Sequence, residues 1–133
     1  MVNIILITLS CLSVLAGCCK TEPNDTASKA EYRKISAEEA HEMLTTLTDF
    51  ILLDVRTETE YMGKRIEGAI LIPHNEIKSR AEKELPNKKA VILVYCRSGV
   101  RSANAAKELV SMGYVNVYDF GGINDWPYDT VNN

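Results

Sequence analysis

The sequence predicts an α/β fold, an open and mostly parallel five-stranded sheet with helices on both faces. From residue 32 onward, segments of strand character alternate with segments of helical character, and this alternation is typical of parallel sheets. The segment 90–95 reads Ala-Val-Ile-Leu-Val-Tyr and is apolar throughout, as expected of a central strand that is covered on both faces. A chain of 133 residues has room for one hydrophobic core and therefore for one main site.

The first predicted strand, 32–35, leads into a helix. Ser36 and Glu39 have the spacing of a capping box, in which each side chain bonds the other residue's amide. The compact apolar run 50–53 that follows this helix predicts a buried parallel strand. The remaining predicted elements are a short helix over 57–62, a strand over 69–72, a polar, water-facing helix over 79–85, a helix over 102–112 and a last strand over 115–120.

The N-terminal segment differs from the rest of the chain. Residues 2–17 contain no charged side chain and are too few for a comfortable membrane span, which takes about 20 apolar residues. They lead into Leu-Ala-Gly-Cys at 15–18, which resembles the bacterial lipobox, where the cysteine is lipidated and the preceding segment is removed. This resemblance implies a signal peptide over 1–17 and a lipid on Cys18. The polar composition that follows, with a proline and no apolar periodicity, predicts a flexible tether over 18–30 before a domain over 31–133.

An ordinary secretory peptide and an uncleaved membrane anchor are the alternatives for this segment. Each of them exports the domain. We therefore expect an exported lipoprotein, anchored to a membrane through its N-terminal lipid and facing the periplasm or the cell exterior.

The composition and net charge of the chain argue against nucleic acid as a partner. Charged residues make up 25% of the chain and the net charge is -3. Acidic and basic residues are interleaved, so the chain offers no broad cationic face of the kind that binds phosphates.

Cys96 follows the predicted central strand, at the end where open parallel sheets bind ligands. The loop 96–101 reads Cys-Arg-Ser-Gly-Val-Arg, and its glycine and small serine let successive amides face one point. The following helix N-terminus and the two arginines add positive charge. We therefore expect a cysteine thiolate with a lowered pKa, which is a nucleophile at neutral pH.

A cysteine at the end of a strand is more often a small buried hydrophobe. A purely structural cysteine gains nothing from two arginines and a glycine turn directly after it, so the loop favours a nucleophile. Counting the others, Cys11 leaves with the signal segment and Cys18 would carry lipid, which leaves Cys19 and Cys96 as thiols. The chain has no Cys-x-x-Cys pair, so we do not expect a disulfide oxidoreductase.

Three ordered motifs resemble the rhodanese family, and the resemblance covers residues 32–126. The family's active loop is Cys-Arg-x-Gly-x-Arg in many members, and 96–101 matches every fixed place. Residues 53–69 resemble its Asp-Val-Arg, Glu-Tyr, Gly-His-Ile and Gly-Ala run, and 121–126 resemble its closing Gly-Gly and Trp signature. Arg65 departs from the pattern, because it stands where the family commonly has histidine.

The resemblance implies a rhodanese-like fold and a sulfurtransferase that works in two half-reactions. A donor such as thiosulfate would give its outer sulfur to Cys96, and the resulting persulfide would pass that sulfur to cyanide or another thiophilic acceptor. No metal or organic cofactor is implied. The implied site consists of Cys96 as catalytic nucleophile and a substrate-binding loop formed by Arg97, Ser98, Gly99, Val100 and Arg101.

Two other functions remain as alternatives. The phosphatases and arsenate reductases built on this fold carry one residue more in the loop than the six residues of 96–101, which disfavours them. A rhodanese module that carries sulfur or binds a partner without turnover is not distinguished from the enzyme by sequence. For the other notable side chains, we expect an internal ion pair between Asp54 and Arg56, surface positions for His41 and His74, and a core position for Trp126.

Overall fold

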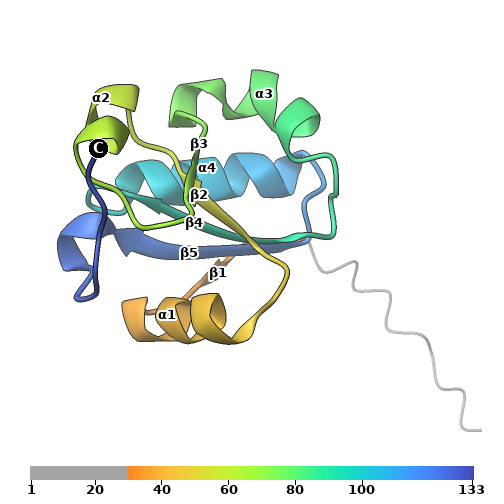
Figure 1. Ribbon diagram of the computed structural model, residues 1–133. Coiled ribbons are helices and arrows are strands. Elements are labelled where there is room, and N and C mark those ends of the chain that lie inside the picture. The colour runs from red at the N-terminus through yellow and green to blue at the C-terminus, as the bar shows by residue number, and fades with distance from the viewer. Residues whose placement is uncertain (1–29) are drawn as a thin grey trace, which may run out of the picture.

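A computed structural model describes residues 30–133, in which one sheet forms the centre of the fold (Figure 1). The strands lie in the order β1-β5-β4-β2-β3, and every neighbouring pair is parallel. The predicted fold class is therefore confirmed, with the predicted central strand, β4, in the middle of the sheet. The strands are β1 (Arg33–Lys34), β2 (Ile51–Asp54), β3 (Ile70–Leu71), β4 (Val91–Cys96) and β5 (Asn116–Gly122).

Helices cover both faces of the sheet. In Figure 1, α1 lies on one face, α3 and α4 lie on the other, and α2 lies near the C-terminus. Two short 3₁₀ turns, η1 and η2, follow β3 and β5 and were not expected from the sequence. The bounds are α1 (Ala37–Thr46), α2 (Glu58–Gly63), η1 (His74–Glu76), α3 (Ile77–Glu84), α4 (Val100–Ser111) and η2 (Ile123–Asp125).

The two faces of the sheet have separate cores, and β4 contributes to both. Ile92, Val94 and Cys96 join the cluster that α3 and α4 cover, whereas Leu93 and Tyr95 join the cluster on the α1 side. All five side chains are fully buried. The burial predicted for this apolar strand is confirmed, because alternate side chains of a strand point to opposite faces.

The capping box of α1 forms as predicted. The hydroxyl of Ser36 accepts from the amide of Glu39 at 3.1 Å, and the amide of Ser36 donates to the Glu39 carboxylate at 2.7 Å. Each bond satisfies an amide that the first helical turn leaves without a partner.

The prediction of a water-facing polar helix over 79–85 is wrong for one face of α3. The helix begins earlier, at Ile77, and buries Ile77 and Ala81, and Leu85 just after it is buried too. These residues recur every fourth position and form an apolar stripe that joins the core cluster containing α4. The polar residues between them make the segment hydrophilic on average, which is why the sequence predicted a helix that faces water.

The predicted signal peptide over 1–17 and lipid-bearing Cys18 lie outside the described residues, as does nearly all of the tether. Within residues 30–133, no helix has the length and apolar character needed to cross a membrane.

Candidate active site

The sheet brings Cys96 to its carboxyl edge. Cys96 is the last residue of β4 and pairs with Gly122 at the end of β5, after a shift in register between Val94 and Cys96. Helix α4 begins at Val100, so only residues 97–99 separate the strand from the helix. This short connection holds the free amides of the helix N-terminus close to the cysteine.

Two glycines make the tight connection possible. Gly99 directly precedes α4 and has a φ of +105°, a left-handed conformation that glycine adopts readily. A Cβ atom on Gly122 would lie 2.7 Å from the Cα of Ser98 and would overlap the carbonyl of Arg97. The Gly-Gly motif that closes the family pattern therefore gives the loop 96–101 the space in which it sits.

The sulfur of Cys96 faces the amides of this loop. The amide of Gly99 donates to Sγ at 3.0 Å, and the nearby backbone of Ser98 and the backbone and hydroxyl of Ser102 also favour the thiolate. Burial is the largest single influence and raises the pKa of Cys96, but the polar groups of Ser98, Gly99 and Ser102 together outweigh it and lower that pKa below its usual value. The lowered pKa expected from the sequence is thus present, because the combined effect of the neighbouring polar groups exceeds that of burial.

Ser102 was not singled out from the sequence. It lies in the first turns of α4 and is 0% exposed. Its hydroxyl donates to the carbonyl oxygens of Gly99 at 3.0 Å and Gly121 at 3.3 Å, so it ties the loop to the end of β5. The available signal was its place three residues after Gly99, where a short hydroxyl side chain reaches back to the backbone of the preceding turn.

Cys96 is the only cysteine within residues 30–133, and it is 0% exposed. The sulfur lies at the bottom of its loop, out of contact with bulk water. A donor therefore reaches it only when the loop or the surrounding side chains move.

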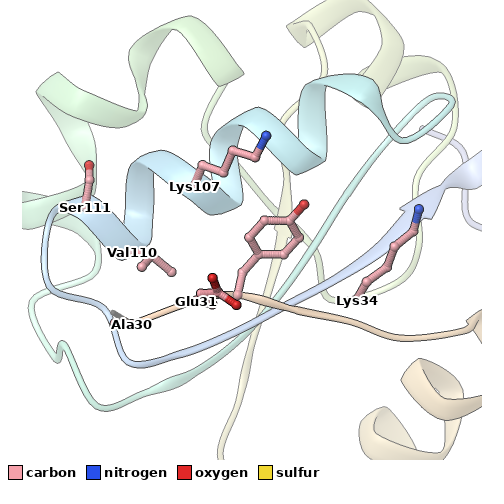
Figure 2. A pocket seen from close by; sticks show the side chains of 7 residues that line it. Ala30, Glu31, Lys34, Lys107, Val110 and Ser111 are labelled. Carbon is pink, nitrogen blue, oxygen red and sulfur yellow. The ribbon is translucent and has the colours of Figure 1, made fainter. Parts of the chain in front are cut away.

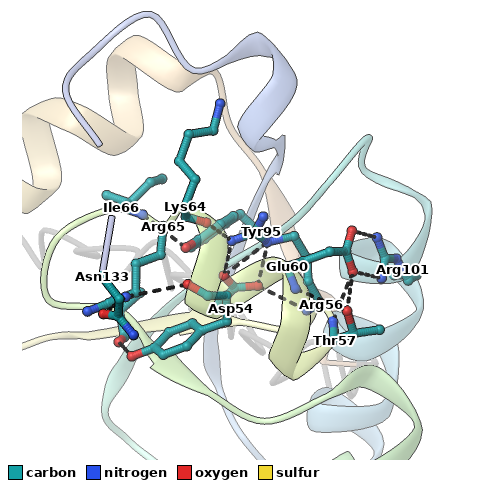
Figure 3. Close-up of polar contacts among 12 residues, drawn as sticks. Asp54, Arg56, Thr57, Glu60, Lys64, Arg65, Ile66, Tyr95, Arg101 and Asn133 are labelled. Carbon is teal, nitrogen blue, oxygen red and sulfur yellow. Dashed lines mark hydrogen bonds and ion pairs between the residues drawn. The ribbon is translucent and has the colours of Figure 1, made fainter. Parts of the chain in front are cut away.

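The two arginines of the loop have different surroundings. Arg97 is exposed and forms no salt bridge with any other described residue. Arg101 forms a two-bond ion pair with Glu60 of α2, at 2.8 Å and 2.9 Å (Figure 3), and this pair holds the pKa of Glu60 far below its usual value. Arg97 thus keeps its charge available for an anionic donor, whereas a carboxylate largely balances the charge of Arg101.

Glu60 has a second task at the start of α2. Its Oε2 atom accepts from the amide of Thr57 at 3.0 Å and from the Thr57 hydroxyl at 2.9 Å, which completes a capping box. The same carboxylate therefore starts α2 and holds Arg101. The spacing of Thr57 and Glu60 was the sequence signal for the cap, but nothing local indicated the partner in the loop.

Asp54 and Arg56 form the predicted internal ion pair (Figure 3). Arg56 donates to both carboxylate oxygens at 2.6 Å to 3.0 Å, and also to the carbonyl oxygen of Lys64 at 2.6 Å. Both side chains are almost fully buried, and the guanidinium lies 5.6 Å from the centre of the Tyr95 ring. The pair joins the ends of β2 and β4 to the segment that follows α2.

Arg65, which replaces the family's usual histidine, binds the C-terminal segment 126–133. Its Nη1 atom donates to the Asn133 side chain at 2.8 Å, and its backbone pairs with Val131 as an antiparallel bridge. The guanidinium also lies 4.7 Å from the centre of the Tyr61 ring.

His41 is only partly buried, and its ring stacks on Tyr128 with 3.7 Å between ring centres, a contact that was not predicted. His74 is exposed, as predicted. Trp126 packs against Phe120 and the core cluster on the α1 side, as predicted. The C-terminal segment thus folds back onto both α1 and α2.

Comparison with known proteins agrees with this geometry. Residues 36–128 match the family model of the rhodanese-like domain. The chain is 38% identical over 73 residues to the thiosulfate sulfurtransferase PspE of Escherichia coli strain K12, covering 55% of this chain and 70% of that protein. It is 32% identical over 96 residues to the thiosulfate sulfurtransferase GlpE of Coxiella burnetii, covering 71% of this chain and 87% of that protein.

Solved structures share the architecture. A rhodanese with anions from E. coli superposes with a TM-score of 0.59 at 35% identity, over 62% of this chain and 98% of that one. The rhodanese-like domain of the Anabaena sp. Alr3790 protein superposes with a TM-score of 0.69 at 27% identity, over 75% of this chain and 79% of that one. Because the family model spans most of the chain and the fold agrees, the chain belongs to the rhodanese family.

Proposed function

We propose that this chain is a sulfurtransferase that forms a persulfide on Cys96 and moves sulfane sulfur from thiosulfate, or a similar donor, to a thiophilic acceptor such as cyanide. The observation that carries the proposal is the placement of the Cys96 sulfur in the loop before α4, where the Gly99 amide donates to it at 3.0 Å and neighbouring polar groups favour the thiolate. The relatives named thiosulfate sulfurtransferase support the same reaction.

In the first half-reaction, the Cys96 thiolate attacks the outer sulfur of thiosulfate. A new S–S bond forms on Cys96, the S–S bond of thiosulfate breaks, and its electron pair leaves with sulfite. The donor is a dianion, so the exposed Arg97 at the mouth of the loop favours its approach. The loop amides then stabilise the negative charge on the persulfide.

In the second half-reaction, cyanide attacks the outer sulfur of the persulfide. The S–S bond breaks, its electron pair stays on Cys96, and thiocyanate leaves. The amides that lower the pKa of Cys96 make it a good leaving group here, because they stabilise the thiolate that is released.

A thiosulfate and cyanide assay on the full chain tests the proposal, with Cys96→Ala and Cys96→Ser as the matched variants. We expect thiocyanate production by the wild type only. We also expect wild type treated with thiosulfate to gain the mass of one sulfur atom, about 32 Da, at Cys96. Equal background rates in all three proteins would contradict the proposed enzymatic activity and favour a rhodanese module that does not catalyse sulfur transfer. Turnover by Cys96→Ala would show that another group carries the sulfur.

The proposal includes export as a lipoprotein, supported by the uncharged segment 2–17 and the sequence Leu-Ala-Gly-Cys at 15–18. Cell fractionation of the full chain tests it. We expect the wild type and Cys19→Ala in the membrane fraction and Cys18→Ala released from that fraction or left unprocessed. Membrane association and processing of Cys18→Ala like those of the wild type would rule out the lipid on Cys18.

A further inference from the structure

A single ion pair joins α2 to the active loop 96–101. Arg101 donates to both carboxylate oxygens of Glu60, at 2.8 Å and 2.9 Å (Figure 3). Within residues 30–133, these are the only hydrogen bonds between α2 and the loop. Both side chains are 26% exposed, so a dissolved anion can reach the pair from the solvent.

The carboxylate is the fixed member of this pair. The Oε2 atom of Glu60 also accepts from the amide and the hydroxyl of Thr57, at 3.0 Å and 2.9 Å. At the other end of α2, the carbonyl oxygen of Lys64 accepts from the buried Arg56 at 2.6 Å. Because α2 is held at both ends, the ion pair separates through a movement of the long Arg101 side chain.

The charge of Arg101 also acts on the nucleophile. Its hydrogen bonds to Glu60 are the largest influence that raises the pKa of Arg101, and attraction by the charges of Glu60 and of the Cys96 thiolate adds to it. The guanidinium therefore lies within reach of two anions, one structural and one reactive. An anionic donor that approaches the sulfur meets the same guanidinium.

Two hollows lie along α4, and Cys96 lines neither of them. The larger, of ≈ 720 Å³, lies between α4 and β1 and is lined by Tyr32, Lys107 and Val110 among others (Figure 2). The smaller, of ≈ 550 Å³, includes residues 98–100 of the loop in its walls. Neither hollow is lined by a member of the ion pair, and Cys96 is 0% exposed. The sulfur therefore becomes reachable through a movement at the loop.

We propose that Glu60 is a positioning residue that keeps the active loop closed over Cys96, and that an anionic sulfur donor opens the loop by replacing the Glu60 carboxylate on Arg101. The sulfonate group of thiosulfate or of a thiosulfonate presents two oxygens to the guanidinium, as the carboxylate does. A neutral sulfane donor has no such pair of oxygens. Glu60 thus selects donors that carry an oxyanion beside the sulfane sulfur.

The selection of donors rests on the proposed sulfurtransferase function, whereas the closure of the loop does not. The two parts are therefore tested by different measurements. Alkylation of Cys96 measures the closure without any sulfur transfer, and steady-state kinetics with thiosulfate measure the part played by the donor.

The closure is tested on the full chain with iodoacetamide, a neutral reagent, and the modification of Cys96 is followed by mass spectrometry of its peptide. At the high-pH plateau, where the thiol is fully ionised, the rate depends on the open fraction and not on the acidity of the thiol. Glu60→Gln keeps the helix cap, since glutamine also serves in a capping box, but it loses the charge and one of the oxygens that face Arg101.

We expect Cys96 to react about fivefold faster in Glu60→Gln than in the wild type, the effect of one ion pair at a partly exposed site. Glu58→Gln removes the same charge from an exposed position of the same helical turn and should react like the wild type. Arg101→Gln should be faster by a similar factor, and it carries the same test if Glu60→Gln does not fold. The double variant should be no faster than either single one, because each change removes the same ion pair.

Iodoacetate, which matches iodoacetamide in size but is negatively charged, measures the freed guanidinium. The ratio of the iodoacetate rate to the iodoacetamide rate should rise in Glu60→Gln and fall in Arg101→Gln. With thiosulfate as donor, Glu60→Gln should lower KM about fivefold with little change in kcat, because binding no longer has to break the ion pair. A lower kcat with an unchanged KM would overturn the replacement of Glu60 by the donor.

The failure of the closure and the failure of the proposed function give different results. Equal iodoacetamide rates in wild type, Glu60→Gln and Arg101→Gln, with thiocyanate still formed by the wild type, would overturn the closure alone. Faster alkylation in both variants, in a chain that forms no persulfide from thiosulfate, would support the closure and overturn the proposed function.

Discussion

The amide of Gly99 donates to the sulfur of Cys96, and the hydroxyl of Ser102 is the one side-chain group among the polar groups that lower the pKa of this thiol. The thiolate is the reacting form, so kcat/KM for thiosulfate rises with pH through the pKa of Cys96 and then levels off. Ser102→Ala removes a hydroxyl that lowers that pKa, and so raises it. We expect about a tenfold loss of kcat/KM at neutral pH, roughly the effect of losing one polar group that favours the thiolate.

The pH profile separates this effect from damage to the fold. For Ser102→Ala the profile should shift to higher pH, and the loss should shrink there, because the thiol ionises eventually. Ser111→Ala, at the other end of α4, should keep the wild-type profile. A uniform loss at every pH would show that Ser102 acts only through packing.

The absence of a side chain at Gly122 leaves room for the backbone of the active loop 96–101. Gly122→Ala places a methyl group against the backbone of Arg97 and Ser98. We expect a loss of about 1 to 3 kcal/mol in the free energy of unfolding, as for other overpacked sites, together with a tenfold or greater loss of turnover, roughly what a misplaced catalytic group costs. Gly63→Ala is the matched control, because no atom lies within 4 Å of its added Cβ; equal losses in both variants would contradict the role of Gly122.

At the scale of elements, α2 and the active loop share the carboxylate of Glu60. Because the pKa of Glu60 is lowered from 4.5, its contribution to stability is present above about pH 4.5 and is lost as pH falls below that value. Glu60→Gln should therefore lower the melting temperature at neutral pH by about 4 to 8 °C, the effect of about 1 kcal/mol in a domain of this size.

The difference between wild type and Glu60→Gln should narrow on acidification, as measured by thermal unfolding at neutral and acidic pH. Glu58→Gln, at an exposed position of the same helical turn, should unfold like the wild type. A gap between wild type and Glu60→Gln that stays constant with pH would show that the ion pair with Arg101 does not contribute.

At the scale of the whole molecule, the C-terminal segment 126–133 closes the fold through Arg65. Arg65→Ala removes the bond to Asn133 and the contact with the Tyr61 ring. We expect a loss of about 1 kcal/mol in the free energy of unfolding, faster proteolysis within 126–133, and unchanged turnover at Cys96. Lys64→Ala, a neighbouring exposed residue, is the control; wild-type resistance to protease in Arg65→Ala would contradict the role of Arg65.

The sheet, its central strand and the active loop could be predicted because their signals are local. An apolar run, a glycine turn and a capping box are each read within a few residues. The bond between Glu60 and Arg101 spans 41 positions, and the stacking of His41 on Tyr128 joins opposite ends of the domain. Such contacts follow from the packing of whole elements, so the pairing of Arg101 and the partial burial of His41 were not visible in the sequence.

Because Cys96 is completely buried, the rate at which reagents modify its sulfur depends on how often the loop opens. When a reagent attacks only the open form, the observed rate is the intrinsic rate multiplied by the fraction of open molecules. Compact reagents need a smaller opening than bulky ones, so modification rates should fall with reagent diameter faster than they do for a free thiol of the same acidity. An activated sulfur in this setting selects its reaction partners by size before it selects them by chemistry.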